Sequence, residues 1–186
     1  MRDSAWHGGW PATTLAAALA VAGASGCAGP GQVAPGTAET DVRARFGAPA
    51  AEYVLAEGPA ARRLEYDTGR FGQRTYMVDV GGDGRVVGVQ QVLTSPHFAQ
   101  VRIGVDTTET IRREFGRPAT TMTYDLSGLT AWQYPYRENE VWNSLMSIEF
   151  DHDGVVRQVQ NGPDPLYEAH DGGGGAHRDG GGHGHR

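Results

Sequence analysis

Phe46-Gly47-Ala48-Pro49 and Phe115-Gly116-Arg117-Pro118 are two copies of one short pattern, and they lie 69 positions apart in the chain. A second pattern recurs almost in step, because Asp83-Gly84 is followed 70 positions later by Asp153-Gly154. Two unrelated turn sequences that repeat at nearly the same offset indicate a tandem copy of one supersecondary unit. The preserved features are turns and core positions rather than chemical groups, which argues against an enzyme.

Each Phe-Gly-x-Pro pattern is typical of the end of a helix, since glycine adopts the left-handed position there and proline blocks continuation. We expect Thr37 to cap the first helix, with Val42 and Phe46 on its apolar stripe. The second helix begins at Asp106-Thr107-Thr108-Glu109, which matches a capping box, and Ile111 starts its apolar stripe.

The segments after each helix alternate apolar and polar residues, which predicts strands, and the two Asp-Gly turns predict hairpins. The fold class is therefore α+β: two tandem repeats, each with one or two short helices followed by a three- or four-stranded antiparallel sheet. Whether the two sheets join stays open. The expected strands are Glu52–Leu55, Arg62–Tyr66, Thr75–Val80 and Arg85–Leu93, then Thr120–Tyr124, Leu129–Tyr136, Leu145–Phe150 and Val155–Gln160.

The beginning of the chain has the pattern of an export signal. Pro11–Ala24 is an apolar run of the length of a signal-peptide core, too short for a membrane-spanning helix. It leads into Ala24-Ser25-Gly26-Cys27, which resembles the lipobox of bacterial lipoproteins, although leucine is more usual than Ala24. The resemblance implies that Cys27 is lipidated, and two acyl chains suffice for stable anchoring. The alternative is an ordinary cleaved signal that leaves Cys27 as a buried free thiol.

The lipobox, Gly36-Thr37-x-x-x-x-Val42 leading into Phe46, and an Asp-Gly hairpin between valine-rich strands occur together. They resemble the SmpA/OmlA (BamE-like) lipoprotein domain, which is similar in fold to tandem-repeat beta-lactamase inhibitor proteins. The resemblance covers about residues 35–162 as two copies, whereas BamE has one. It implies a non-enzymatic outer-membrane lipoprotein that faces the periplasm and binds an envelope protein, as an accessory of the beta-barrel assembly machinery. The alternative is an inhibitor of a periplasmic hydrolase.

The expected organisation follows from these patterns and from composition. The C-terminal tail is glycine- and histidine-rich and nearly free of apolar residues, which predicts disorder. Metal buffering by this tail is a further alternative. The expected parts are a signal peptide (1–26), a linker after the lipidated cysteine (27–34), repeat 1 (35–97), repeat 2 (98–167) and the disordered tail (168–186). The weak metal candidates are His170, His177, His183 and His185.

Several kinds of chemistry are disfavoured. The net charge is −6, and no basic cluster exceeds two adjacent arginines, so nucleic acid is a poor partner. No G-x-S-x-G elbow occurs, and we expect no cofactor. Asp151-x-Asp153-Gly154 lacks the glutamate of a calcium-binding EF-hand loop, and we interpret it as a turn. His97 lies between the copies, where we expect a surface or capping residue.

Aromatic residues supply the remaining candidates. Trp132, Tyr134 and Tyr136 alternate along one strand, which predicts that they lie in the core. Pro135 predicts that this strand runs at a sheet edge. Trp142 lies in a polar loop and is our candidate partner-binding residue, since loop aromatics are typical interface anchors. The alternative is that Trp142 packs back onto the sheet.

Overall fold

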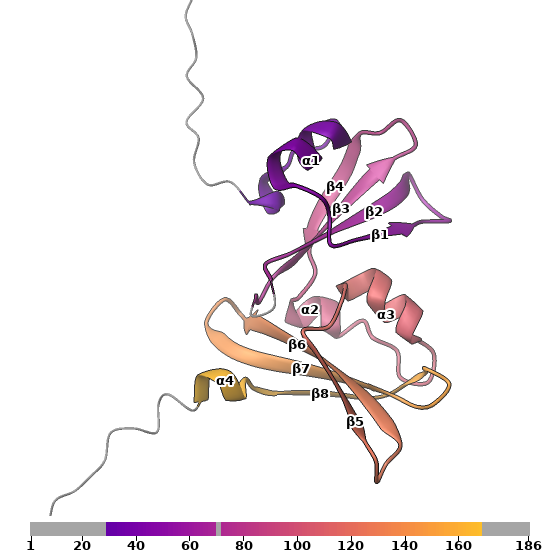
Figure 1. The fold of residues 1–186 in the computed structure, drawn as a ribbon, viewed down its shortest axis with the longest axis vertical. Coiled ribbons are helices and arrows are strands. Elements are labelled where there is room, and N and C mark those ends of the chain that lie inside the picture. Colours follow the sequence, from indigo (N-terminus) through magenta and orange to yellow (C-terminus); the bar gives the residue numbers. More distant parts are fainter. Residues whose placement is uncertain (1–28, 70–71, 169–186) are drawn as a thin grey trace, which may run out of the picture.

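The computed structural model describes residues 29–69 and 72–168, which form two successive α+β units (Figure 1). The first unit contains η1 (Pro30–Gln32), α1 (Glu39–Phe46), β1 (Ala51–Val54), β2 (Ala60–Asp67), β3 (Thr75–Gly81) and β4 (Val86–Gln91). The second contains α2 (Ser95–Phe98), α3 (Thr108–Phe115), β5 (Thr120–Tyr124), β6 (Leu129–Glu138), β7 (Trp142–Phe150), β8 (Val156–Pro163) and α4 (Pro165–Glu168). The predicted α+β class with two sheet-containing units is confirmed.

The strands form two separate four-stranded sheets, each a simple antiparallel meander. The orders are β1-β2-β3-β4 and β5-β6-β7-β8, and within the described residues no strand of one sheet pairs with the other. The question left open by the sequence is thus answered, because the sheets do not join. Each sheet has a register shift in its third strand, between Asp79 and Val80 and between Glu149 and Phe150.

The ends of α1 and α3 are built alike. Gly47 and Gly116 both have φ of 82°, a left-handed conformation that glycine adopts without strain. The Tyr66 hydroxyl donates a hydrogen bond to the Gly47 carbonyl (3.2 Å), and the Tyr134 hydroxyl donates one to the Gly116 carbonyl (3.1 Å). In both units, a tyrosine of the second strand therefore fixes the turn that the Phe-Gly-x-Pro pattern predicts.

The segment before each long helix is clipped to the first residue of the last strand. Gly36 N–H donates to the Val86 carbonyl, and Val86 N–H donates to the Thr37 carbonyl, each over 2.8 Å. In the second unit, Gly104 N–H donates to the Val156 carbonyl (2.8 Å) and Val156 N–H to that of Asp106 (2.9 Å). These backbone pairs close each unit by joining its start to its end.

Both predicted helix starts need correction by one residue. The residue before α1 is Ala38, which has no side-chain cap, and the Thr37 hydroxyl donates instead to the Ala34 carbonyl. The capping box of α3 joins Thr107 to Thr110 rather than Asp106 to Glu109. The reason is that the Asp106 carboxylate already accepts hydrogen bonds from Arg102, so the helix starts one residue later.

The elements stack in four layers, in the order α1, first sheet, α2 with α3, second sheet (Figure 1). Between α1 and the first sheet lies a core of six buried residues: Val42, Leu64, Tyr66, Val78, Val80 and Val86. A larger core fills the space around α2 and α3. Its buried residues are Met77, Val92, Leu93, Phe98, Ile111, Phe115, Trp132, Tyr134, Tyr136, Met146, Ile148, Phe150 and Val156. The prediction that the aromatic trio lies in the core is confirmed.

The prediction of an edge strand from Pro135 is wrong, because β6 pairs with both β5 and β7. The pairing of β5 with β6 begins at Thr120 opposite Gln133, two residues short of Pro135. The carbonyl of Gln133 faces β5, and backbone direction alternates along a strand, so the ring nitrogen of Pro135 faces the same side. Its missing N–H therefore costs no ladder bond, since β5 does not reach it.

Candidate functional site

A buried carboxylate joins the two units. Glu65 of β2 is 0% exposed, and it accepts hydrogen bonds from the Tyr53 hydroxyl (2.6 Å) and from the backbone N–H of Arg117 (3.1 Å). Burial and the hydrogen bond to Glu65 raise the pKa of Tyr53, which keeps the phenol protonated as a donor. Gly116 packs so closely that an added Cβ would lie 2.8 Å from Glu65 Cδ. This carboxylate holds α3 against the first sheet and leaves no space for a ligand.

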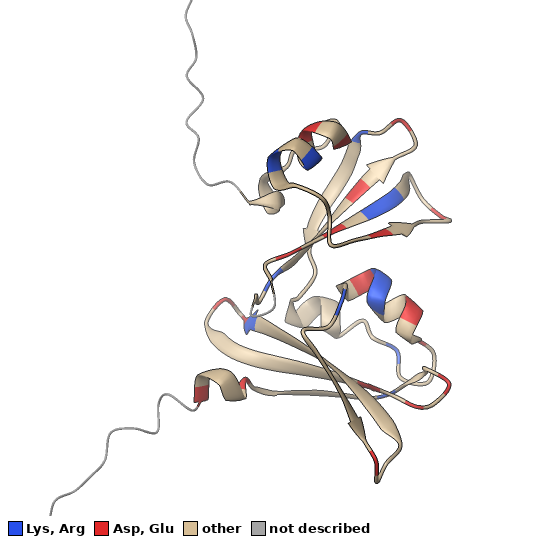
Figure 2. Cartoon of the chain, viewed as in Figure 1, with Lys and Arg blue, Asp and Glu red and all other residues tan. Residues whose placement is uncertain are grey.

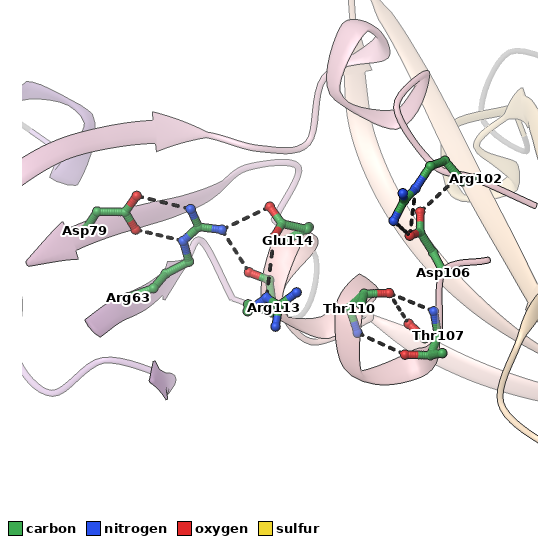
Figure 3. A network of polar contacts seen from close by, with 8 residues as sticks. All are labelled: Arg63, Asp79, Arg102, Asp106, Thr107, Thr110, Arg113 and Glu114. Atoms are coloured by element: carbon green, nitrogen blue, oxygen red, sulfur yellow. Dashed lines mark hydrogen bonds and ion pairs between the residues drawn. The ribbon is translucent and has the colours of Figure 1, made fainter. Parts of the chain in front are cut away.

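Arg63 forms a second joint between the units, as Figure 3 shows. Its guanidinium donates two hydrogen bonds to the Asp79 carboxylate (2.7 and 3.1 Å), one to Glu114 (3.0 Å) and one to the Arg113 carbonyl (3.2 Å). Burial lowers the pKa of Arg63, but Asp79 and Glu114 outweigh it and raise that pKa. Forked, charge-assisted bonds of this kind fix orientation as well as adding energy. Every contact is internal, so this network is structural.

His97 is buried in α2, which corrects the prediction of a surface or capping residue. Its ring packs edge-on against Phe115 with centroids 4.7 Å apart. Burial lowers the pKa of His97, so the imidazole is neutral at pH 7. The helix is capped instead by Thr94, whose hydroxyl accepts the N–H of His97. Sequence reasoning missed this core role because α2 is a single turn with no periodic pattern.

Asp106 and Asp151, two carboxylates near the second unit's turns, are both engaged internally. Burial would raise the pKa of Asp106, but hydrogen bonds from Arg102 outweigh it and lower the pKa. Asp151 accepts the N–H of Asp153 (3.0 Å) and of Val155 (2.9 Å) and the guanidinium of Arg157 (2.6 Å). The turn interpretation of this segment thus agrees with its hydrogen bonds. Across 29–69 and 72–168, no three side chains of the metal-ligating types gather around one point.

Trp142 is the first residue of β7 and is 67% exposed, beside Val141, which is 60% exposed. The alternative that Trp142 packs back onto the sheet is therefore wrong. The turn before it is tight, because Asn139 and Glu140 have φ of 51° and 59°. Trp142 pairs with Glu138, and this is the pair of the β6–β7 hairpin that lies next to the turn. About two-thirds of the Trp142 side chain is therefore left uncovered by the described residues.

The tip of the β6–β7 hairpin is held by the first unit. Arg74 forms an ion pair with Glu140, and the Gln73 amide donates to Asn143 Oδ1 over 3.0 Å. Arg137 also donates to Asn143 Oδ1 (2.9 Å) and to the Glu140 carbonyl (3.1 Å). An aromatic residue on an ordered tip loses little freedom on binding, which favours affinity. The structure thus presents Trp142 as an exposed apolar side chain beside a hairpin tip that is bonded to the first unit.

A second exposed surface is the face of β5–β8 that turns away from α2 and α3, and we call it the open sheet face. No helix in the described part of the chain covers its centre. A groove on it is lined by Met122, Tyr124, Pro135, Leu145, Asp164 and Leu166, among others. Two buried polar atoms, Ser147 Oγ and Asp164 Oδ2, have no hydrogen-bond partner among described residues. Ser147 lies on this face by strand alternation, since Met146 and Ile148 are in the core.

The remaining sequence candidates lie outside the described residues. Cys27, the signal segment and the four histidines of the tail are all there, so lipidation and metal binding stay predictions. In the part of the chain that the structure covers, the helices are all too short or too polar to traverse a lipid bilayer.

Comparisons with known proteins add little. No family model and no curated protein matches the chain. Among solved structures, a DUF4309 family protein, YjgB from Bacillus subtilis subsp. subtilis str. 168, is similar over 69% of this chain and 79% of that chain. The sequence identity is 17% and the TM-score is 0.29, a value too low to support an argument about fold or function.

Proposed function

We propose that this chain is a non-enzymatic outer-membrane lipoprotein that binds an envelope protein on the periplasmic side. The observation that carries the proposal is the exposed Trp142 at a hairpin tip of the second unit that residues of the first unit also contact. Aromatic anchors on rigid supports are typical centres of protein interfaces. Four groups with catalytic potential are instead engaged in packing or internal hydrogen bonds: Glu65, His97, Asp106 and Asp151.

A tandem duplication of one BamE-like unit is part of this proposal. It is supported by the shared element order, by the matching register shifts, and by the tyrosine that bonds the glycine carbonyl after each helix. The backbone clip that closes each unit also recurs, at Val86 and at Val156. The two units therefore agree in their turns and also in the hydrogen bonds that hold these turns. A chance resemblance of two short sequence motifs would not be expected to include the hydrogen bonds.

Lipidation of Cys27 would set where the protein sits. Pro30, where η1 begins, is only three positions after Cys27. At about 3.3–3.6 Å per residue, three such steps span at most about 11 Å. The first unit would therefore lie close to the lipid headgroups, and the second unit would carry Trp142 toward a membrane-associated partner. The beta-barrel assembly machinery is the partner that the family resemblance favours.

The test is copurification of the tagged full-length protein from detergent-solubilised envelopes of the native cell. We expect beta-barrel assembly components to be recovered with the native chain, and to be lost with Cys27→Ala and with Trp142→Ala. The matched control is Leu126→Ala, which removes an even more exposed apolar side chain from the β5–β6 turn. Recovery that is unaffected by Trp142→Ala would contradict the proposed contact. Recovery of a soluble hydrolase by both the native and Cys27→Ala forms would favour an inhibitor instead.

A further inference from the structure

The two sheets differ in how their faces are covered. The first sheet has α1 on one face and α3 on the other, whereas the second sheet has α2 and α3 on one face only (Figure 1). Figure 2 shows charged residues concentrated on α1, α3 and the first sheet, while β5 and β6 are largely uncharged. The open sheet face therefore corresponds in position to the face that α3 covers in the first unit.

We propose that the open sheet face binds helix α1 of a second copy of this chain, in the way that the first sheet binds α3. This head-to-tail contact goes beyond the proposed function and uses a different surface from Trp142. The equivalent positions of the two units show which side chains would meet.

The sheet positions are matched by their hydrogen bonds and register. The hydroxyls of Tyr66 and Tyr134 both donate to the carbonyl of the glycine that follows the helix, so these two tyrosines occupy equivalent positions. The residues before them, Glu65 and Gln133, are therefore equivalent as well. Two residues earlier, Arg63 corresponds to Ala131. Their cross-strand partners are Asp79 and Glu149, and each partner lies directly before the register shift of its sheet. The set Arg63, Glu65 and Asp79 on the first sheet thus corresponds to Ala131, Gln133 and Glu149 on the second.

The helix positions are matched by the glycines that follow α1 and α3, since Gly47 and Gly116 have the same φ of 82°. Counting from these glycines, Arg45 of α1 corresponds to Glu114 of α3, and Ala48 corresponds to Arg117. An added Cβ at Gly116 would meet Glu65, whereas one at Gly47 would meet nothing within 4 Å. The end of α1 is therefore open at the place where the end of α3 is in contact.

The charges that would meet are complementary. Inside the chain, Arg63 bridges Glu114 and Asp79. Between copies the bridging arginine is replaced by Ala131, and the helix instead carries Arg45, which would face Glu149 across that small residue. Glu149 is only 8% exposed, and no hydrogen bond or ion pair engages it within the described residues. At the matched helix position, the acidic Glu114 of α3 is replaced by the basic Arg45 of α1. At the matched sheet position, the basic Arg63 is replaced by the neutral Ala131.

The second joint changes in the same concerted way. Inside the chain, the Glu65 carboxylate accepts the N–H of Arg117. Between copies, the amide oxygen of Gln133 would accept the N–H of Ala48, a neutral pair in place of a charged one. The open sheet face also holds Ser147 Oγ and, at its groove, Asp164 Oδ2, which is buried to 5% exposure and unpartnered in the described part.

Sedimentation velocity of the purified full chain carrying Cys27→Ser tests the proposal. A head-to-tail contact uses two different surfaces, so association continues beyond a dimer. We expect the mean mass to rise steadily over a roughly hundredfold range of concentration. Arg45→Glu, a change on an exposed helix position, should weaken association by roughly tenfold or more, since it sets two acids against each other. A monomer at every concentration would overturn the proposal.

A charge exchange separates this contact from a general loss of stability. Arg45→Glu combined with Glu149→Arg should restore association, because the pair is then reversed rather than broken. The matched control Glu57→Arg makes a comparable charge change on the exposed β1–β2 turn and should leave association unchanged. If Glu149→Arg does not fold, by circular dichroism, Glu149→Gln in the native background should still weaken association. The contact would be refuted if Arg45→Glu changed the association constant no more than Glu57→Arg does.

Discussion

In the first sheet, the face turned away from α1 is covered by α3 and forms a joint inside the molecule. In the second sheet, the corresponding face is open. The strand order and the hydrogen bonds at the helix ends are the same in both units. What differs is the side chains on that one face, where Arg63 and Glu65 correspond to Ala131 and Gln133. The same strand order thus occurs with one face covered by a joint inside the chain in the first unit and with the corresponding face open in the second.

The cores of the two units differ as well. Six buried residues form the core under α1, while 13 form the core around α2 and α3, and Met77, Val92 and Leu93 of that larger core come from the first unit. Burying one large apolar side chain contributes about 1.5–3 kcal/mol. The first unit therefore depends on the joint for part of its apolar burial, and we expect the two units to unfold together.

The largest expected effect comes from a pair of matched glycine substitutions. Gly47→Ala and Gly116→Ala place the same strain on a backbone with φ of 82°, but only the second drives a Cβ to 2.8 Å from Glu65. We expect a loss of about 1 kcal/mol in unfolding free energy for Gly47→Ala. For Gly116→Ala we expect a further loss of about 2–3 kcal/mol, because the buried Glu65 joint is forced apart. Urea unfolding measures both, and equal losses would mean that the joint is not tightly packed.

A smaller difference is expected between the two tyrosines that fix the helix ends. Tyr66→Phe and Tyr134→Phe each remove one hydrogen bond to a glycine carbonyl. Tyr134 is the more deeply buried, at 1% exposure against 6%, so its carbonyl partner is left without water. We expect losses of about 0.5–1 kcal/mol for Tyr66→Phe and about 1–3 kcal/mol for Tyr134→Phe. Thermal unfolding at fixed pH would show the order, and the reverse order would contradict the burial argument.

The third prediction concerns pH. Burial lowers the pKa of His97 in the folded protein, so below the ordinary histidine pKa of 6.5 the unfolded state binds more protons. The stability that the neutral imidazole supports is fully present above that pH and declines as the pH falls through it. In His97→Phe this part of the pH dependence should vanish. Unfolding free energies of the native chain and of His97→Phe, measured on both sides of that pH, check the prediction, and an unchanged slope in His97→Phe would contradict it.

The smallest effect on stability is expected at the hairpin tip. Trp142→Ala removes a side chain that is 67% exposed, so the unfolding free energy should change by no more than about 0.5 kcal/mol. A large loss in chemical denaturation would show that the indole packs against the molecule and is not held free for a partner. The paired substitution Glu140→Gln, which breaks the ion pair to Arg74, should loosen the tip and weaken partner capture with little change in stability.

Local turn chemistry made much of the fold predictable. The glycine and proline after each helix and the Asp-Gly hairpins act within a few residues, and predicted strands such as Thr120–Tyr124 agree with the structure. The errors arise where tertiary contacts decide. The assignment of Pro135 to an edge failed because β5 is shorter than β6, and nothing within β6 records the length of its neighbour.

The joint between the units was also invisible in the sequence. Glu65 alternates with Leu64 and Tyr66, the pattern of a residue on a wet face of a sheet, yet α3 covers that face. A packing helix from the next unit cannot be inferred from the period of the strand. For Trp142, the sequence indicated a polar loop and left two outcomes open. The brace from Arg74, far away in the chain, helps hold the tip that presents the indole to solvent.

The backbone clip at Val86 has a mechanical consequence. The segment before α1 is bonded to the start of β4 through Gly36 and Thr37. Under the proposed lipidation of Cys27, the chain would be tethered by its N-terminal side, and movement of a bound partner relative to the membrane would put tension on that side. That tension would reach these two bonds before it reached α1, so the clip would shield the helix and its core from the pull of the tether.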